Sequence, residues 1–155
     1  MQKHNLNESY FPVKEVPVMY DMVGKDESIN AGYKLIVRED NNKILSCMTD
    51  NYKLVTNKDI MEKAEPVLKE QGAILSDVHM FGNGARVRYK YRFPDTKVEV
   101  EKNDFVNPEI IINNSYDGTS EVSAMGGAFR LLCSNGLVIG YTIGKEGSRH
   151  TVWNK

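Results

Sequence analysis

Residues 86–93 read Arg86-Val87-Arg88-Tyr89-Lys90-Tyr91-Arg92-Phe93. Successive side chains of a β-strand point to opposite faces, so this stretch predicts a strand with two unlike faces. One face carries only cations and the other carries only apolar or aromatic side chains. Such a strand is typical of an antiparallel sheet that buries one face and exposes the other.

Strand-like segments continue on both sides of this stretch, and turn signals separate them. The turn signals are pairs and triplets rich in glycine, asparagine, aspartate and proline. They stand at Gly82-Asn83-Gly84, Pro94-Asp95, Asp117-Gly118 and Asn135-Gly136. The sequence therefore predicts strands over residues 74–80, 85–93, 97–101, 109–113, 129–133 and 137–141.

One segment before these strands has a helical pattern. Thr56 followed by Asp59 has the spacing of a capping box, with an acid in the first turn. Apolar residues then recur at helical spacing, and Gly72 is placed to end the helix in a left-handed conformation. Pro66 would interrupt the helix interior, so we expect either a kink or two short helices. The apolar positions are Ile60, Ala64, Val67 and Leu68.

The N-terminal third predicts further strands. Pro12 and Pro17 interrupt the apolar alternation of residues 10–22, and proline cannot donate a ladder hydrogen bond, so this segment predicts an edge strand or a peripheral arm. Residues 32–37 and 44–48 flank a polar turn and predict a hairpin. The expected fold class is α+β, mostly antiparallel sheet with one principal helix on one face. The expected organisation is an arm or edge strand over residues 1–22, one domain over 23–145 and a polar tail over 146–155.

Composition excludes several classes of protein. The 155 residues include 20 Lys and Arg against 21 Asp and Glu, so no global positive field attracts nucleic acid or anionic membrane. Any nucleic-acid affinity must come from a local patch. Cys47 and Cys133 lack the spacing of a redox or metal motif, and no apolar run is long enough to span a bilayer. We therefore expect a cytoplasmic protein that does not enter a membrane.

The cationic strand has two interpretations. In the first, the segment binds single-stranded nucleic acid: its four cations contact the phosphates, and Tyr89 or Tyr91 stacks on a base. The cations are Arg86, Arg88, Lys90 and Arg92. In the second, the strand is the salt-bridged outer face of an ordinary sheet. If Pro94-Asp95 closes a tight hairpin, Lys90 lies opposite Glu99 and Arg88 opposite Glu101. Both interpretations stay open at the level of sequence.

No catalytic or metal-binding set emerges from the sequence. Gly82-Asn83-Gly84 lacks the third glycine and the following helix of a phosphate-binding loop, which favours a hairpin turn. Cys133, His150 and Asp117 supply the residue types of a nucleophile, a base and an orienting acid, but a cysteine beside two leucines is more often a buried small hydrophobe. We expect no catalytic residue, no metal and no cofactor.

Three stretches together resemble a known family. They are residues 112–120 (INNSYDGTS), residues 129–138 (FRLLCSNGLV) and residues 148–151 (SRHT), preceded by residues 52–57 (YKLVTN) before the predicted helix. In this order they resemble the phage- and plasmid-borne family catalogued as domain of unknown function 932. The resemblance implies a role with DNA in phage replication or recombination, because its order of strands and helix is similar to that of single-strand annealing proteins. Arg130, Arg149 and His150 stand within these stretches and would also bind phosphate.

The leading hypothesis is thus a non-catalytic phage or mobile-element protein that binds single-stranded nucleic acid in the bacterial cytoplasm and forms homo-oligomers. The rival hypothesis is a protein-binding module, for instance an inhibitor of a host defence or replication protein. Exposed apolar residues in the N-terminal segment, such as Phe11, Val13 and Val18, would favour the rival, because such a segment can add a strand to a partner.

Overall fold

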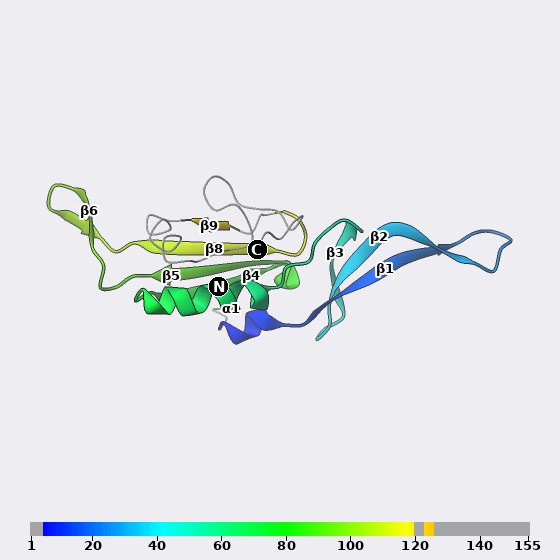
Figure 1. Ribbon diagram of the computed structural model, residues 1–155, viewed down its shortest axis with the longest axis horizontal. Helices are drawn as coiled ribbons and strands as arrows, with labels where there is room; N and C mark the ends of the chain where they lie inside the picture. The colour runs from blue at the N-terminus through cyan, green and yellow to red at the C-terminus, as the bar shows by residue number, and fades with distance from the viewer. Residues whose placement is uncertain (1–4, 120–122, 126–155) are drawn as a thin grey trace.

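Strands dominate the computed structural model, which describes residues 5–119 and 123–125 (Figure 1). The α+β class predicted from the sequence is confirmed. In chain order the elements are η1 (Asn7–Tyr10), β1 (Val13–Asp21), β2 (Ser28–Arg38), β3 (Lys43–Thr49), α1 (Asn57–Glu70), β4 (Ile74–Phe81), η2 (Gly82–Gly84), β5 (Arg86–Arg92), β6 (Val98–Glu101), β7 (Asp104–Val106), β8 (Glu109–Ser115) and β9 (Ser123–Met125).

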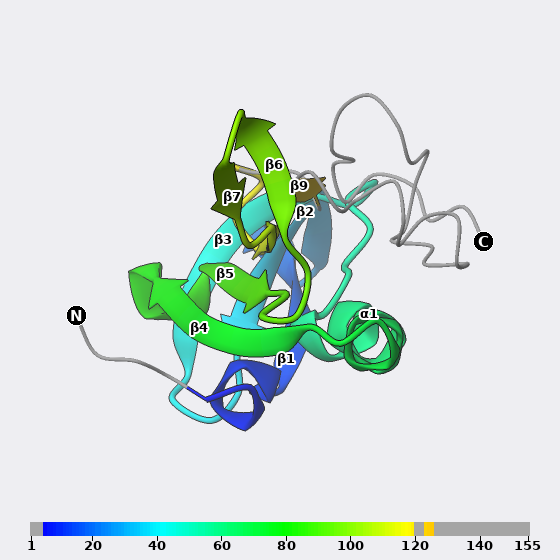
Figure 2. The same cartoon turned by 90° about the vertical axis from the view of Figure 1, so that its left-hand side faces the viewer.

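The described strands form separate antiparallel sheets. One has the order β1-β2-β3, a second has the order β4-β5-β8-β9, and β6 pairs only with β7. The β1–β2 hairpin and the β6–β7 hairpin extend at opposite ends of the long axis (Figure 1). Helix α1 lies alongside β4 and β5, as the end-on view also shows (Figure 2).

The alternation of residues 86–93 has the predicted effect on β5. Its apolar and aromatic side chains are almost completely buried and pack with the apolar face of α1, from Ile60 to Leu68. Since β5 lies between β4 and β8, it forms the centre of the main core. The buried side chains are Val87, Tyr89 and Tyr91 of β5 and Phe93 directly after it.

Helix α1 begins and ends at the predicted signals. The Thr56 hydroxyl accepts a hydrogen bond of 3.1 Å from the backbone N–H of Asp59. At the other end Gly72 has φ +83°, and the N–H of Ala73 reaches back 2.9 Å to the carbonyl of Leu68, the pattern of a Schellman cap. Pro66 lies inside this one helix, so the alternative of two short helices is wrong. The buried face of α1 holds the helix together across the proline.

The N-terminal segment is an edge strand rather than a loose arm. β1 pairs with β2 along its length, with a shift in register next to Pro17. Phe11, which we expected to be exposed, is 7% exposed. The Arg38 guanidinium lies 3.9 Å from the centre of the Phe11 ring, and the ring meets Tyr116 edge-on. The predicted hairpin of residues 32–37 and 44–48 is confirmed as β2 and β3.

The turn at Pro94-Asp95 does not close the predicted hairpin. β5 pairs with β8 instead, so Lys90 faces Ile111 and Arg88 faces Asn113. Ile110 and Ile112 of β8 are completely buried, and they continue the apolar layer over α1. This burial explains why β8, and not β6, lies next to β5. The predicted strands at 129–133 and 137–141 and the tail lie outside the described residues.

Candidate nucleic-acid interface

The face of the β4-β5-β8 part of the sheet that points away from α1 carries the cations of β5. We call it the outer face. It is formed by Asp77, His79 and Phe81 of β4, by Arg86, Arg88, Lys90 and Arg92 of β5, and by Glu109, Ile111 and Asn113 of β8. The Arg86 side chain is 52% exposed and that of Lys90 is 40% exposed. The structure therefore brings the four predicted β5 cations together on one face.

Carboxylates partly neutralise this face, but they are not the predicted ones. Nζ of Lys90 lies 3.2 Å from Oε2 of Glu109, and Nε of Arg86 lies 3.6 Å from Oδ2 of Asp117. Glu99 belongs to the separate β6–β7 hairpin, where its carboxylate accepts a hydrogen bond from the Asn103 backbone. Exposed ion pairs of this kind contribute about 0–1 kcal/mol, so a phosphate can compete with either carboxylate.

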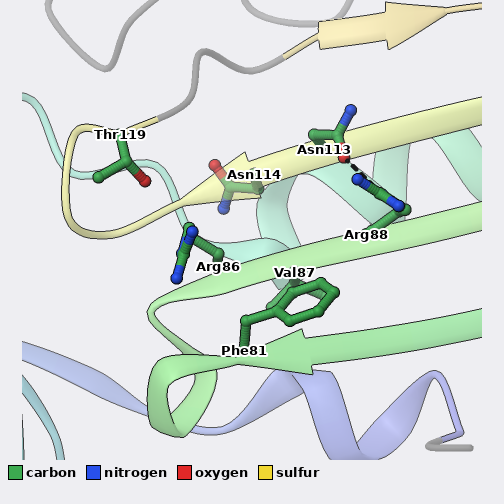
Figure 3. A pocket seen from close by; sticks show the side chains of 7 residues that line it. All are labelled: Phe81, Arg86, Val87, Arg88, Asn113, Asn114 and Thr119. Atoms are coloured by element: carbon green, nitrogen blue, oxygen red, sulfur yellow. Dashed lines mark hydrogen bonds between the residues drawn. The ribbon is translucent and has the colours of Figure 1, made fainter. Parts of the chain in front are cut away.

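A hollow of about 330 Å³ opens on the outer face where β4 ends and β5 begins (Figure 3). Nε of Arg88 donates to Oδ1 of Asn113 at 3.4 Å, which directs the guanidinium along the rim. Two arginines, two asparagines, a threonine and one aromatic ring thus border a single open volume. The lining residues are Phe81, Arg86, Val87, Arg88, Asn113, Asn114 and Thr119.

Two rings stand beside the cations on β4. His79 lies opposite Arg88 and Phe81 opposite Arg86 in the β4–β5 ladder. The ring centres are 6.1 Å apart and the ring planes differ by 31°. The Asp77 carboxylate contacts Nε2 of His79, which holds the imidazole in place. Sequence reasoning missed both rings, although the alternation of Asp77, His79 and Phe81 up to the Gly82 turn was available as a signal.

Tyr89 and Tyr91 do not lie on this face. Both rings are buried, at 0% and 1% exposed, so the expectation that one of them stacks on a base is not supported. The Tyr89 hydroxyl donates to Oγ of Ser9 at 2.7 Å, and that of Tyr91 donates to the Glu65 carboxylate. Burial raises the pKa of Tyr89 well above its ordinary value. Tyr89 therefore stays neutral, and both tyrosines have a structural role.

The stretch around residues 113–119 forms a buried polar network. Nδ2 of Asn114 donates to the carbonyl of Val55 at 3.2 Å and to Oδ1 of Asn57 at 2.7 Å. The backbone N–H of Asn57 donates to the Tyr116 hydroxyl at 2.7 Å, and burial raises the pKa of that hydroxyl. Asn114 thereby ties β8 to the start of α1.

Asp117 and its turn complete the rim of the hollow. Oδ1 of Asp117 accepts a 3.0 Å hydrogen bond from the N–H of Thr119, and Gly118 between them has φ +71°. This short turn fixes the carboxylate next to Arg86 and places Thr119 at the hollow. The turn lies where the sequence predicts one, at Asp117-Gly118.

Several predicted site residues cannot be placed on this face. Arg130, Arg149 and His150 lie outside the described residues, as does Cys133. Among the residues that the structure describes, no group of three or more His, Cys, Asp or Glu side chains could hold a metal ion. No helix in that part of the chain is long and apolar enough to cross a membrane.

Comparison with known proteins supplies the family. The model of the family described as Domain of unknown function (DUF932) matches residues 44–152. Two proteins of Escherichia coli (strain K12), UPF0380 protein YfjQ and UPF0380 protein YafZ, are each 53% identical to this chain over 38 residues. That match covers 24% of this chain and 14% of each relative. No solved structure matches. Because the family model covers more than half of the chain, the protein belongs to the family of the domain of unknown function 932.

Proposed function

We propose that the outer face binds single-stranded nucleic acid and catalyses no reaction on it. The observation that supports this proposal is the row of four cations on the central strand β5 beside the hollow. Alternate residues of a strand are about 6.6 Å apart, so the row offers a cation at regular steps along an extended polyanion. The setting we propose is phage or mobile-element replication or recombination in the bacterial cytoplasm, which rests on the family resemblance.

Local charge, rather than the net charge of −1, carries this binding. Arg86 and Lys90 have weakly held carboxylate partners, while Arg88 is held by a neutral amide. When phosphates of the nucleic acid replace the carboxylates, Arg86 and Lys90 remain paired with an anion. The nucleic acid then gains contacts with the protein. Binding of this kind releases condensed cations from the nucleic acid and therefore weakens as salt increases.

The test is fluorescence anisotropy of a labelled single-stranded oligonucleotide across a salt series. We expect the double variant Arg86→Ala/Arg88→Ala to bind at least tenfold more weakly at low salt. Each lost phosphate contact lowers the salt slope by about 0.7 for a single strand, so the double variant should lower it by about 1.4.

The matched control is Lys14→Ala/Lys25→Ala, which removes two exposed cations of β1 and its hairpin. This control should bind as the unmodified protein does. Absence of binding at low salt would exclude the proposal for this chain, and so would an equal loss of affinity in the control.

A second candidate is a protein-binding module that uses the tip of the β1–β2 hairpin. Met19, Tyr20, Met22 and Val23 are exposed there, with Val23 completely so. An exposed apolar group of this kind is typical of a protein contact. The residues we first expected to make this contact are less suitable, because Phe11 is buried and Val13 and Val18 are partly buried.

Point variants separate the two candidates better than deletion of residues 1–22. Such a deletion would remove β1 and also Ser9, which bonds to Tyr89 in the core. Met19→Ser/Val23→Ser would alter only the tip. If the chain is a protein-binding module, this variant loses its protein partner and leaves oligonucleotide binding unchanged.

A further inference from the structure

We infer that His79 and Phe81 form a two-base stacking platform, so that the outer face takes successive unpaired bases as well as phosphates. The inference rests on the proposed function and adds the chemical class of the ligand. Its basis is the β4–β5 ladder, which sets each ring directly beside one arginine, His79 beside Arg88 and Phe81 beside Arg86.

A ring beside a guanidinium group fits a nucleotide better than it fits other anions. The cation attracts the phosphate, and the flat ring offers a surface for the base. An acidic peptide would use the cations but would leave the rings without a matching group. The same pair of one ring and one arginine occurs twice, two residues apart along each strand. It therefore points to a ligand built from a repeating unit that has one base and one phosphate.

The spacing of the rings indicates an extended single strand. Their centres are 6.1 Å apart. Stacked bases in a strand of B-form DNA are separated by about 3.4 Å, and their faces are covered by neighbouring bases. Bases that lie on both rings must consequently be unstacked from each other. A duplex does not offer such bases, whereas an extended single strand does.

The Phe81 ring lies at the wall of the hollow on the outer face. Phe81 forms one side of it, and Arg86, Arg88, Asn113 and Thr119 contribute polar groups around it (Figure 3). Its volume of about 330 Å³ lies at the small end of ligand pockets. We assign this position to one nucleotide and the His79 position to its neighbour, with the Asp77 carboxylate holding the imidazole ring.

The test compares three ligands of equal length in the anisotropy assay: a single strand, the same backbone with abasic sites, and a duplex. Base–aromatic stacking contributes about 1–3 kcal/mol per base, so the protein should bind the base-bearing strand at least fivefold more tightly than the abasic strand. It should also prefer the single strand to the duplex.

Phe81→Leu keeps apolar volume at this partly buried position and removes the aromatic face. We expect it to lower the preference for bases over abasic sites at least fivefold while the salt slope stays unchanged, and Phe81→Trp should restore the preference. Tyr33→Ala, which removes an exposed ring of the other sheet, is the matched control and should keep the preference.

The outcomes distinguish this inference from the function on which it rests. Equal affinity of the unmodified protein for base-bearing and abasic strands would overturn the stacking platform and leave phosphate binding intact. A preference that survives Phe81→Leu and His79→Ala would also overturn it. Absence of binding to every ligand would remove the proposed function together with the inference.

Discussion

Asp117 has two roles at the rim of the hollow. One carboxylate oxygen accepts a hydrogen bond from the N–H of Thr119 and closes the turn after β8. The other lies 3.6 Å from Nε of Arg86 and offsets its charge. The first role needs only an acceptor oxygen, whereas the second needs a negative charge. A single substitution can therefore remove the negative charge next to Arg86 and keep the acceptor oxygen for Thr119.

Asp117→Asn should strengthen oligonucleotide binding. The asparagine amide oxygen still accepts from Thr119, while the loss of charge frees Arg86 for a phosphate. An exposed pair contributes about 0–1 kcal/mol, so the gain should be up to about fivefold at low salt and should decrease as salt rises. The measurement is the anisotropy titration, with Asp50→Asn as a control at an exposed position in the turn after β3. Weaker binding by Asp117→Asn would contradict this role.

The residues of the outer face were predictable to different degrees. The period of two in residues 86–93 predicts the cation row, because alternation alone decides which side chains share a face. It also places Tyr89 and Tyr91 opposite that row, where the structure has them buried. The partners of Asn114 were not predictable, since Val55 and Asn57 lie 59 and 57 positions earlier in the chain. Only the tertiary fold brings them together.

The sequence predicts helix α1 together with the residues at which it begins and ends. Its limits follow from local chemistry, because the Thr56 cap and the left-handed Gly72 act within one turn of the backbone. The pairing of β5 was not predictable from such local signals. The sequence offers β6 as the nearest partner, but burial of Ile110 and Ile112 selects β8. Strand order therefore depends on the core as a whole.

Pro66→Ala should stabilise the protein. Pro66 is exposed within the helix interior, so alanine leaves no cavity, supplies the missing N–H and removes the clash with the preceding turn. Proline is less favourable than alanine in a helix interior by about 3 kcal/mol. Because packing of α1 in the folded protein already offsets part of this cost, we expect the free energy of unfolding to increase by about 1–2 kcal/mol. Urea unfolding measures this change, and Glu70→Ala at the exposed helix end is the control. A lower free energy of unfolding for Pro66→Ala would contradict the account.

At the scale of the whole molecule, the N-terminal segment fixes one sheet to the other. Phe11 packs under the Arg38 guanidinium of β2 and meets Tyr116 after β8. A Cβ added to Gly84 would come within 2.6 Å of the Phe11 ring, so the turn before β5 closes directly on this contact. The position of the outer face relative to the β1–β2 hairpin is thereby set by packing at one junction.

This arrangement separates the two candidate surfaces. The outer face lies in the middle of the molecule, over β4 and β5, while the apolar tip of the β1–β2 hairpin lies at one end of the long axis (Figure 1). A ligand of a few nucleotides can contact one of these surfaces without reaching the other. The place where a short strand attaches therefore distinguishes the two functions.

Photo-cross-linking shows directly where single-stranded nucleic acid binds: a short oligonucleotide that carries a photoreactive base is cross-linked to the protein, and mass spectrometry identifies the cross-linked peptides. We predict cross-links in β4 and β5, centred on His79 and Phe81, and their loss in Arg86→Ala/Arg88→Ala and at high salt. Cross-links confined to the β1–β2 hairpin, or cross-links on β4 and β5 that persist at high salt in the double variant, would contradict the claim that the outer face binds single-stranded nucleic acid.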